Sequence, residues 1–260
     1  MLDGVDLFSL NRSQMRRVRG SGIAMISQEP MAALDPSFTV QSTLSEVIRL
    51  HDRGSRTATK ARGLELLELV GLPDPMRVAR QYPHQLSGGM AQRVAIAVAL
   101  AGRPKVLIAD EPTTALDVTV QAEILGVLRS LCTNTNLAVM LVTHDWGVVA
   151  DICQRVVVMY AGQVVESGPV AELVLGPLNP YTEGLLHSNP ADASPRQPLV
   201  AIPGAVPQPH EWPSGCRFAP RCRYAIEACR GAPVDLVEAS SGRSTRCIRS
   251  GELARLELAG

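Results

Sequence analysis

Aromatic residues, lysines, a surplus of either charge and long apolar runs are all scarce or missing in this sequence. Aromatic side chains make up 3% of the 260 residues, and 25 basic residues, of which only Lys60 and Lys105 are lysines, face 25 acidic ones. A net charge of zero argues against a nucleic-acid partner held by bulk positive charge. No apolar run approaches the roughly 18 residues that cross a bilayer, and the first residues do not form a signal peptide. We therefore expect a soluble, intracellular chain that is free to sit on a membrane protein.

Short apolar segments alternate with helical patterns over the first 160 residues. The segments typical of strands are 23–27, 106–109, 137–143 and 152–160, and the helical patterns cover 41–82, 91–101 and 119–131. Ala161 and Gly162 are expected to turn the last of these strands, so that residues 163–166 return. This alternation predicts an α/β fold with a parallel, doubly wound sheet. In such sheets the functional side chains gather at the carboxyl ends of the strands.

Polar side chains stand where three of these strands end. Gln28 follows the first strand, Asp110 and Glu111 end the second, and His144 ends the third. An acidic pair can hold Mg²⁺ through Asp110 and polarise a water through Glu111, and a glutamine can orient that water or complete the Mg²⁺ shell. A histidine at this edge can stabilise charge on a terminal phosphate. Each residue taken alone has an ordinary structural alternative: a loop carboxylate, a structural histidine or a solvated amide.

A serine and two glycines open the helix predicted at 91–101. The stretch QLSGGMAQR covers residues 85–93. Backbone N–H groups at a helix start, together with a hydroxyl, can bind a phosphate. No lysine accompanies this loop, and a flexible turn is the alternative.

Four of the six cysteines crowd into the end of the chain, after a Pro-rich segment at 190–213 that is typical of a linker. They are Cys216, Cys222, Cys229 and Cys247. In an intracellular protein such clustering indicates metal binding before disulfides. The spacing is not the C-x2-C pairing of zinc ribbons, and four thiolates suit a [4Fe–4S] cluster. Zinc, and a metal-free tail with thiols or disulfides, remain alternatives.

The order and spacing of these segments resemble the ATP-binding subunits of ABC transporters. The matching stretches are SQEP (27–30, the Q-loop), LSGGMAQR (86–93, the signature), VLIADEPTTALD (106–117, Walker B and D-loop) and THD (143–145, the switch histidine). Longer stretches, NPYTEGLL and the cysteine tail among them, resemble the oligopeptide/dipeptide importer branch. The resemblance covers essentially all of residues 1–260.

The resemblance implies a domain plan and a set of ligands. It implies an incomplete P-loop NTPase-like parallel sheet in an ATPase domain at 1–188, a helical subdomain at about 39–101, and an importer-type extension at 189–260. Two such ATPase domains pair head to tail and bind ATP and Mg²⁺. Some importers of this branch resemble cluster carriers in their tail, which supports the [4Fe–4S] expectation.

The resemblance also distributes the site residues between two nucleotides. Asp110 binds Mg²⁺, and Asp117 of the D-loop reaches across the interface to the partner. The catalytic residues of the chain's own site are Glu111, His144 and Gln28, and those that contact the partner's ATP are Ser87, Gly88, Gly89 and Gln92.

The implied function is to couple ATP hydrolysis to the import of di- and oligopeptides at the cytoplasmic face of the membrane. The implied partners are a second ATPase subunit, two permease subunits and, indirectly, an extracytoplasmic substrate-binding protein, and the segment between Gln28 and Leu86 docks on the permease. A soluble ABC-type ATPase in DNA repair or translation is a second hypothesis, which low aromatic content, neutral charge and the tail oppose. The sequence does not give the solute, and nickel or other small solutes remain alternatives to peptide.

The chain departs from the family pattern in one respect. No G-x-x-x-x-G-K-[ST] motif occurs, so the phosphate cradle and its lysine are missing from these residues. Residues 1–10 resemble the segment that follows this motif, and we interpret the chain as starting inside the domain. We expect it to be poorly soluble alone, to hydrolyse no ATP, and to leave the Walker B strand with an unpaired edge. The alternative function is a non-catalytic remnant that contributes only its signature motif to a partner's site.

Overall fold

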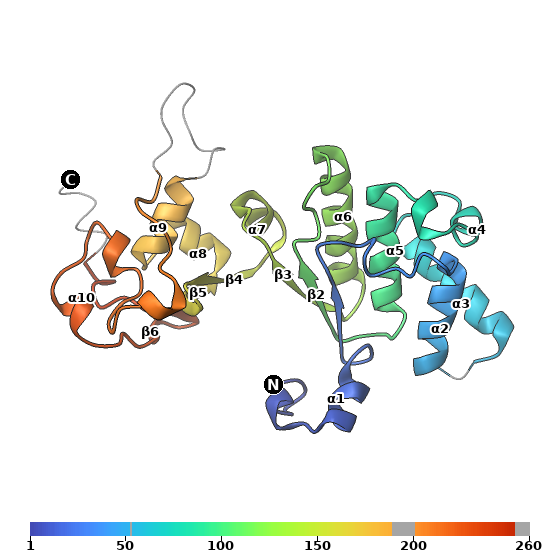
Figure 1. Ribbon diagram of the computed structural model, residues 1–260, viewed down its shortest axis with the longest axis horizontal. Coiled ribbons are helices and arrows are strands. Elements are labelled where there is room, and N and C mark those ends of the chain that lie inside the picture. Colours follow the sequence, from blue (N-terminus) through green and yellow to red (C-terminus); the bar gives the residue numbers. More distant parts are fainter. Residues whose placement is uncertain (53, 189–200, 253–260) are drawn as a thin grey trace. The chain divides into compact units, whose positions relative to one another are not determined.

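A computed structural model of the chain describes residues 1–52, 54–188 and 201–252. They divide into two compact units, Met1–His144 and the residues from Asp145 onward (Figure 1). Part of the predicted linker, residues 190–200, lies outside the described residues. Within the described part of the chain, no helix is both long and apolar enough to span a membrane.

The first unit is built on a three-stranded parallel sheet. Its order is β1 (Ile23–Ile26), β2 (Val106–Asp110), β3 (Ala138–Val142). The face that carries Leu107 and Ala109, which are fully buried, packs in one hydrophobic core with helices α5 (Gly88–Leu100) and α6 (Val118–Asn134). The strands form because short, largely apolar runs can bury one face under these helices.

The position of the Walker B strand corrects one expectation. β2 lies in the centre of the sheet and pairs in parallel with β1 on one side and β3 on the other, so its edges are not unpaired. The apolar surface lies elsewhere, on the second face of the sheet, where Met25 is 57%, Met140 58% and Val142 43% exposed. Parallel sheets are normally covered by helices on both faces. In the first unit, the described helices cover one face of the sheet, and the face with these three side chains is left exposed.

Six further helical segments belong to the described part of the first unit. They are η1 (Leu7–Ser9), α1 (Arg12–Val18), α2 (Val40–His51), α3 (Arg56–Leu69), α4 (Pro75–Val78) and η2 (Pro83–Gln85). Of these, α2 and α3 pack against α5. The single helical pattern at 41–82 is therefore broken: Ser55 caps the start of α3, and Gly71, at φ +70°, follows its end. Leu44 of α2 and Leu66 of α3 are fully buried in the core that α5 shares.

The second unit contains a four-stranded sheet in the order β4 (Arg155–Tyr160), β5 (Gln163–Pro169), β7 (Arg243–Thr245), β6 (Val237–Ser240). All its pairings are antiparallel, so the strand predicted at 152–160 does not join the parallel sheet. Ala161 and Gly162, both at positive φ, form the two-residue connection that turns β4 back into β5. The helices are α7 (Trp146–Ile152), α8 (Val170–Leu175), α9 (Pro180–His187), η4 (Pro209–Glu211), η5 (Ala219–Arg221) and α10 (Ala228–Gly231).

The cysteine-bearing segment shares a core with the strands before it. Glu166 of β5 is fully buried, and its carboxylate accepts hydrogen bonds from the backbone of Leu178 and Asn179 and from Arg243 of β7. A cluster of three aromatic rings joins β4, α9 and the tail: Tyr160, Tyr181 and Phe218.

Candidate functional site

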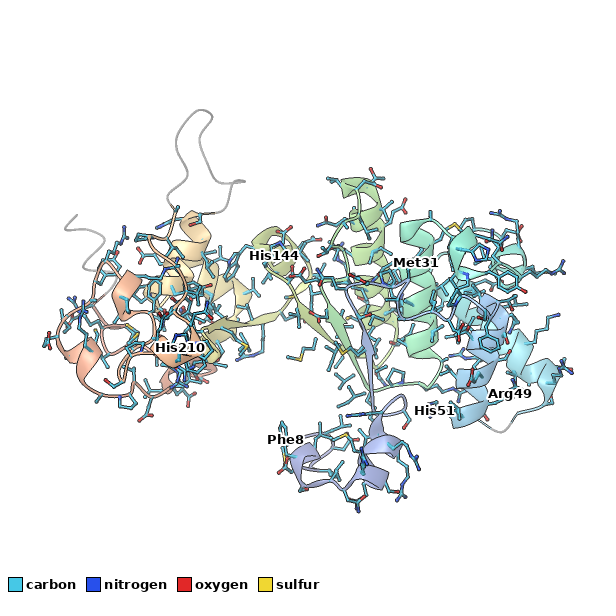
Figure 2. The ribbon with its side chains drawn as sticks, viewed as in Figure 1. Phe8, Met31, Arg49, His51, His144 and His210 are labelled. Atoms are coloured by element: carbon cyan, nitrogen blue, oxygen red, sulfur yellow. The ribbon has the colours of Figure 1, made fainter. Side chains whose placement is uncertain are left out.

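The carboxylate of Glu111 is the meeting point of the three strand ends. The Nε2 group of Gln28, which follows β1, donates to Glu111 Oε2 at 3.1 Å. His144, which follows β3 (Figure 2), places its Nδ1 3.0 Å from Glu111 Oε1. The three residues predicted as catalytic are therefore in contact, because the carboxyl ends of parallel strands meet at one edge of the sheet.

Thr114 is the fourth member of this group, and sequence reasoning missed it. Its Oγ1 donates to Glu111 Oε2 at 2.8 Å. The hydrogen bond from Thr114 and then the one from His144 lower the pKa of Glu111, so this carboxyl group is ionised at neutral pH. The His144 side chain is 79% exposed and that of Glu111 26%, which leaves the group open to a ligand from solvent.

Asp110 is the last residue of β2 and stands beside Val142 of β3 in the sheet register. It is partly exposed, and no residue in the described part of the chain hydrogen-bonds to its carboxylate. A carboxylate oxygen is a ligand that Mg²⁺ prefers. The donor set at this strand end therefore fits the expected metal.

The signature loop opens α5. Ser87 is its N-cap, and the Oγ atom accepts a hydrogen bond from the backbone N–H of Met90 at 3.3 Å. Gly88 and Gly89 supply the first N–H groups of the helix, which have no intrahelical partner and suit an anion. A Cβ on Gly89 would lie 2.5 Å from Cγ1 of Val120 in α6, so this glycine is also required by the close approach of the two helices.

Gln92 and Asp117 are placed differently from the loop residues. Gln92 is only 2% exposed, and its Nε2 has no partner among the described residues, so its side chain lies inside the unit. Asp117 is exposed and is the N-cap of α6, where its carboxylate accepts from the backbone of Val120 at 3.0 Å. Whether either residue contacts a nucleotide stays a prediction.

Arg93, the last residue of the signature stretch, connects three helices. Its Nη1 donates to the carbonyl oxygens of Val70 at 2.9 Å and Gly71 at 3.1 Å, at the end of α3. Its Nη2 donates to Glu123 of α6 at 2.7 Å. The signature helix is therefore fixed to the helices on either side of it.

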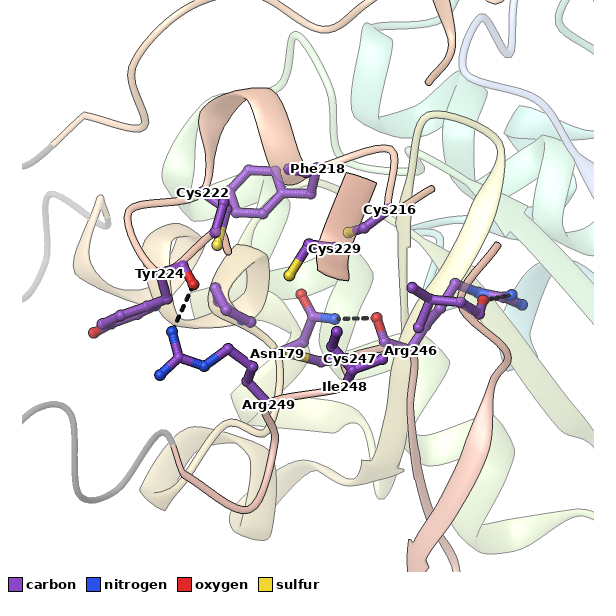
Figure 3. Close-up of a pocket in the computed structure, with 14 residues that line it drawn as sticks. Asn179, Cys216, Phe218, Cys222, Tyr224, Cys229, Arg246, Cys247, Ile248 and Arg249 are labelled. Carbon is purple, nitrogen blue, oxygen red and sulfur yellow. Dashed lines mark hydrogen bonds between the residues drawn. The ribbon is translucent and has the colours of Figure 1, made fainter. Parts of the chain in front are cut away.

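Four cysteines of the second unit line one small cavity (Figure 3). Burial, with neighbouring cysteines adding to it, raises the pKa of the Cys216 and Cys247 thiols and brings that of Cys222 to about 11. Asn179 lines the same cavity and donates to the carbonyl oxygens of Val165 and Arg246.

The geometry of this cavity does not support the iron–sulfur expectation. Its volume is about 20 Å³, which is room for little more than one water molecule. Across residues 1–52, 54–188 and 201–252, no group of three or more His, Cys, Asp or Glu side chains could hold a metal ion. The four thiols have the right chemistry to bind a cluster, but the cavity that they line is too small to contain one.

Comparison with known proteins decides the family. The family model described as "ABC transporter" matches residues 2–114, and the model "Oligopeptide/dipeptide transporter, C-terminal region" matches residues 165–229. A protein of Brucella melitensis biotype 1, named as a peptide import ATP-binding protein, is 50% identical over 256 residues, which are 96% of this chain and 76% of that protein. The chain belongs to the ATP-binding proteins of ABC transporters. The resemblance drawn from the sequence is thereby confirmed.

Two further relatives and two solved structures agree. The oligopeptide transport ATP-binding protein AppD of Bacillus subtilis is 47% identical, over 95% of this chain and 75% of AppD. The dimeric ATP-binding cassette MJ0796, in a post-hydrolysis state with ADP and phosphate, superposes with a TM-score of 0.58 at 32% identity, over 65% of this chain and 72% of that one. The cassette cbiO1 of Clostridium perfringens gives 0.57 at 29% identity, over 64% and 63%. A peptide import ATP-binding protein of Brucella abortus is 50% identical over 256 residues, the same values as for the Brucella melitensis protein. The expected α/β fold with a parallel sheet is confirmed.

Proposed function

We propose that this chain is the ATP-binding subunit that couples ATP hydrolysis to the import of peptides through a membrane permease. The observation that carries the proposal is the contact of Gln28 and His144 with the Glu111 carboxylate at the joint end of three strands. Peptide as the solute rests on the names of the relatives and on the match of the importer-type C-terminal region.

The strand-end residues have distinct roles in this proposal. Asp110 would hold Mg²⁺, and the ionised Glu111 would accept a proton from the attacking water. Gln28 and His144 hold the carboxylate from two sides and would contact the metal and the terminal phosphate of a bound nucleotide. When bound, ATP and Mg²⁺ would supply the transferable phosphoryl group and the charge that neutralises it.

The signature loop serves a second subunit in this proposal. Ser87, Gly88 and Gly89 offer a hydroxyl and free N–H groups at the start of α5 to the nucleotide of a partner ATPase, and the exposed Asp117 belongs to the same interface. The prediction that Gln92 also contacts this nucleotide is opposed by the burial of its side chain. A dimeric cassette among the similar structures supports a paired arrangement. We propose no nucleic-acid partner.

The domain plan and the membrane partners are also proposals. We propose an ATPase domain at 1–188 with a helical subdomain at about 39–101, and an extension at 189–260. Helices α2 to α4, between the Q-loop and the signature, dock on the membrane permease. The permease consists of two subunits, and an extracytoplasmic substrate-binding protein delivers the solute to it. This places the chain at the cytoplasmic face of the membrane, as a peripheral subunit.

The signature loop supports a second candidate function. Residues 85–93 contain the whole loop, and Ser87 caps the helix that follows it. We propose as the alternative that the chain completes a partner's ATP site and hydrolyses no ATP at its own.

One assay separates the two candidates. The chain is combined in detergent with the permease pair and an ATPase subunit that carries the cradle motif, and ATP turnover is measured. Both candidates require turnover to rise when the chain is added and to fall when Ser87→Arg replaces the wild type. Glu111→Gln lowers turnover only when the chain's own site works, and unchanged turnover on adding the chain would contradict both.

The cysteine tail carries the remaining cofactor proposal, a [4Fe–4S] cluster held by four thiolates. The number of thiols that line one cavity supports it, and the small volume of that cavity opposes it. Anaerobic purification followed by metal analysis decides: bound iron with broad visible absorption supports the cluster, bound zinc supports the zinc alternative, and a metal-free tail with titratable thiols overturns both.

A further inference from the structure

Thr114 and Glu111 lie in the same loop, between β2 and α6, and Thr114 hydrogen-bonds to the Glu111 side chain. The Thr114 hydroxyl donates to Glu111 Oε2 at 2.8 Å, and the Thr114 backbone N–H donates to the Glu111 carbonyl oxygen at 3.2 Å. Gln28 and His144 come from other strand ends, whereas Thr114 belongs to the same turn as the carboxylate. The turn is thus closed twice, once by the backbone and once through the side chain.

Glu111 needs such support because its backbone is strained. Its φ is +44°, in the left-handed region that a glutamate rarely occupies. The Glu111 N–H donates to the carbonyl oxygen of Val142 at 2.9 Å, which fixes the backbone against β3. The carboxylate of the side chain that leaves this backbone is held by the hydrogen bonds from Gln28 and Thr114 and by His144.

The two carboxylate oxygens are divided between different partners. Oε2 accepts from Thr114 and Gln28, and Oε1 faces His144. Of these three partners, Thr114 alone lies in the same turn as Glu111, three residues further along the chain.

We propose that Thr114 is a positioning residue for Glu111, whose hydroxyl holds Oε2 so that Oε1 is presented to the attacking water. The inference rests on the proposed function, in which Glu111 is the base. In this role Thr114 acts through the carboxylate, to which its hydroxyl donates. A serine retains the donor, and a valine of nearly the same shape does not.

The test compares three variants of the full chain. Thr114→Val removes the donor, Thr114→Ser keeps it, and Thr113→Val is the matched control, since none of the hydrogen bonds to Glu111 in the described structure comes from Thr113. In the permease assembly, Thr114→Val lowers kcat about tenfold with KM changed less than about twofold, as expected for a misplaced catalytic group. Thr114→Ser recovers most of the loss, and Thr113→Val leaves kcat unchanged.

A second readout needs no nucleotide. ¹⁵N NMR of the chain alone follows the His144 ring nitrogen and the Gln28 side-chain amide, which both contact the carboxylate. Thr114→Val shifts both signals, and the other two variants leave them in place. A wild-type assembly without turnover would refute the proposed function and leave these shifts to decide the role of Thr114. The positioning role of Thr114 would be overturned if Thr114→Val left the His144 and Gln28 signals unmoved, or if Thr113→Val shifted them as much as Thr114→Val does.

Discussion

Replacing Gly89 by alanine tests whether the signature glycine is required by packing within the chain. The new Cβ would lie 2.5 Å from Val120 Cγ1 and 3.7 Å from the other two nearest atoms of that valine. Val120 is β-branched and has little freedom to turn away. Overpacking of this kind costs about 1–3 kcal/mol, and the helix propensity of alanine returns up to about 1 kcal/mol. We expect a net loss of about 1 kcal/mol in the free energy of unfolding.

A double-mutant cycle isolates this contact. Val120→Ala removes the clashing Cγ1, so Gly89→Ala in that background should cost nothing or stabilise the chain. Urea unfolding of the four variants should give a coupling free energy of at least about 1 kcal/mol, above the deviation of about 0.3–0.5 kcal/mol between independent sites. Gly126→Ala is the control: Gly126 lies inside α6 with nothing within 4 Å of an added Cβ, and the change should stabilise by about 0.5–1 kcal/mol. Additive effects of the Gly89 and Val120 substitutions would refute the packing argument.

Two further predictions concern the second unit. Arg243→Met leaves the buried Glu166 carboxylate without its cation and should lower the free energy of unfolding, measured by thermal denaturation, by about 3–5 kcal/mol. Arg230→Met, at an exposed position, is the control and should change this free energy by less than about 0.5 kcal/mol. Equal effects of the two substitutions would contradict the buried ion pair. Cys222, whose thiol pKa is raised from 9.0 to about 11, carries about a hundredfold less thiolate at pH 8 than an unshifted thiol. Its alkylation in the metal-free chain should therefore be slow at pH 8 and accelerate as the pH rises toward 11, and fast alkylation at pH 8 would show that the thiol is not buried.

The strand-end site was predictable because its logic is local and repeated. The runs IAMI, VLIAD and AVMLV are too short and too apolar to be anything but buried strands, and each is followed at once by a polar residue. Parallel pairing then brings Gln28, Glu111 and His144 together without further information. The helix starts were marked in the same way, since serine or aspartate caps such as Ser87 and Asp117 precede apolar patterns.

The order of the strands was not predictable from the same patterns. Nothing in VLIAD indicates that β2 pairs on both sides. The Ala161-Gly162 turn did indicate that 163–166 returns beside the strand before it, as β5 does, but not that the two strands lie in a separate antiparallel sheet. Strand order depends on which crossover packs where, and an apolar run fits either sheet. Thr114 was missed for a related reason: its contact depends on the positive φ of Glu111, which the residue type does not indicate. For the cysteines, spacing indicated that they gather but not how small a cavity they line.

The most direct test of the central claim is peptide uptake into proteoliposomes that contain the permease pair and a cradle-bearing ATPase subunit, with and without this chain. We expect ATP-dependent uptake that requires the chain and is lost when Ser87→Arg replaces it. Uptake at the same rate in the absence of the chain would contradict the proposed function.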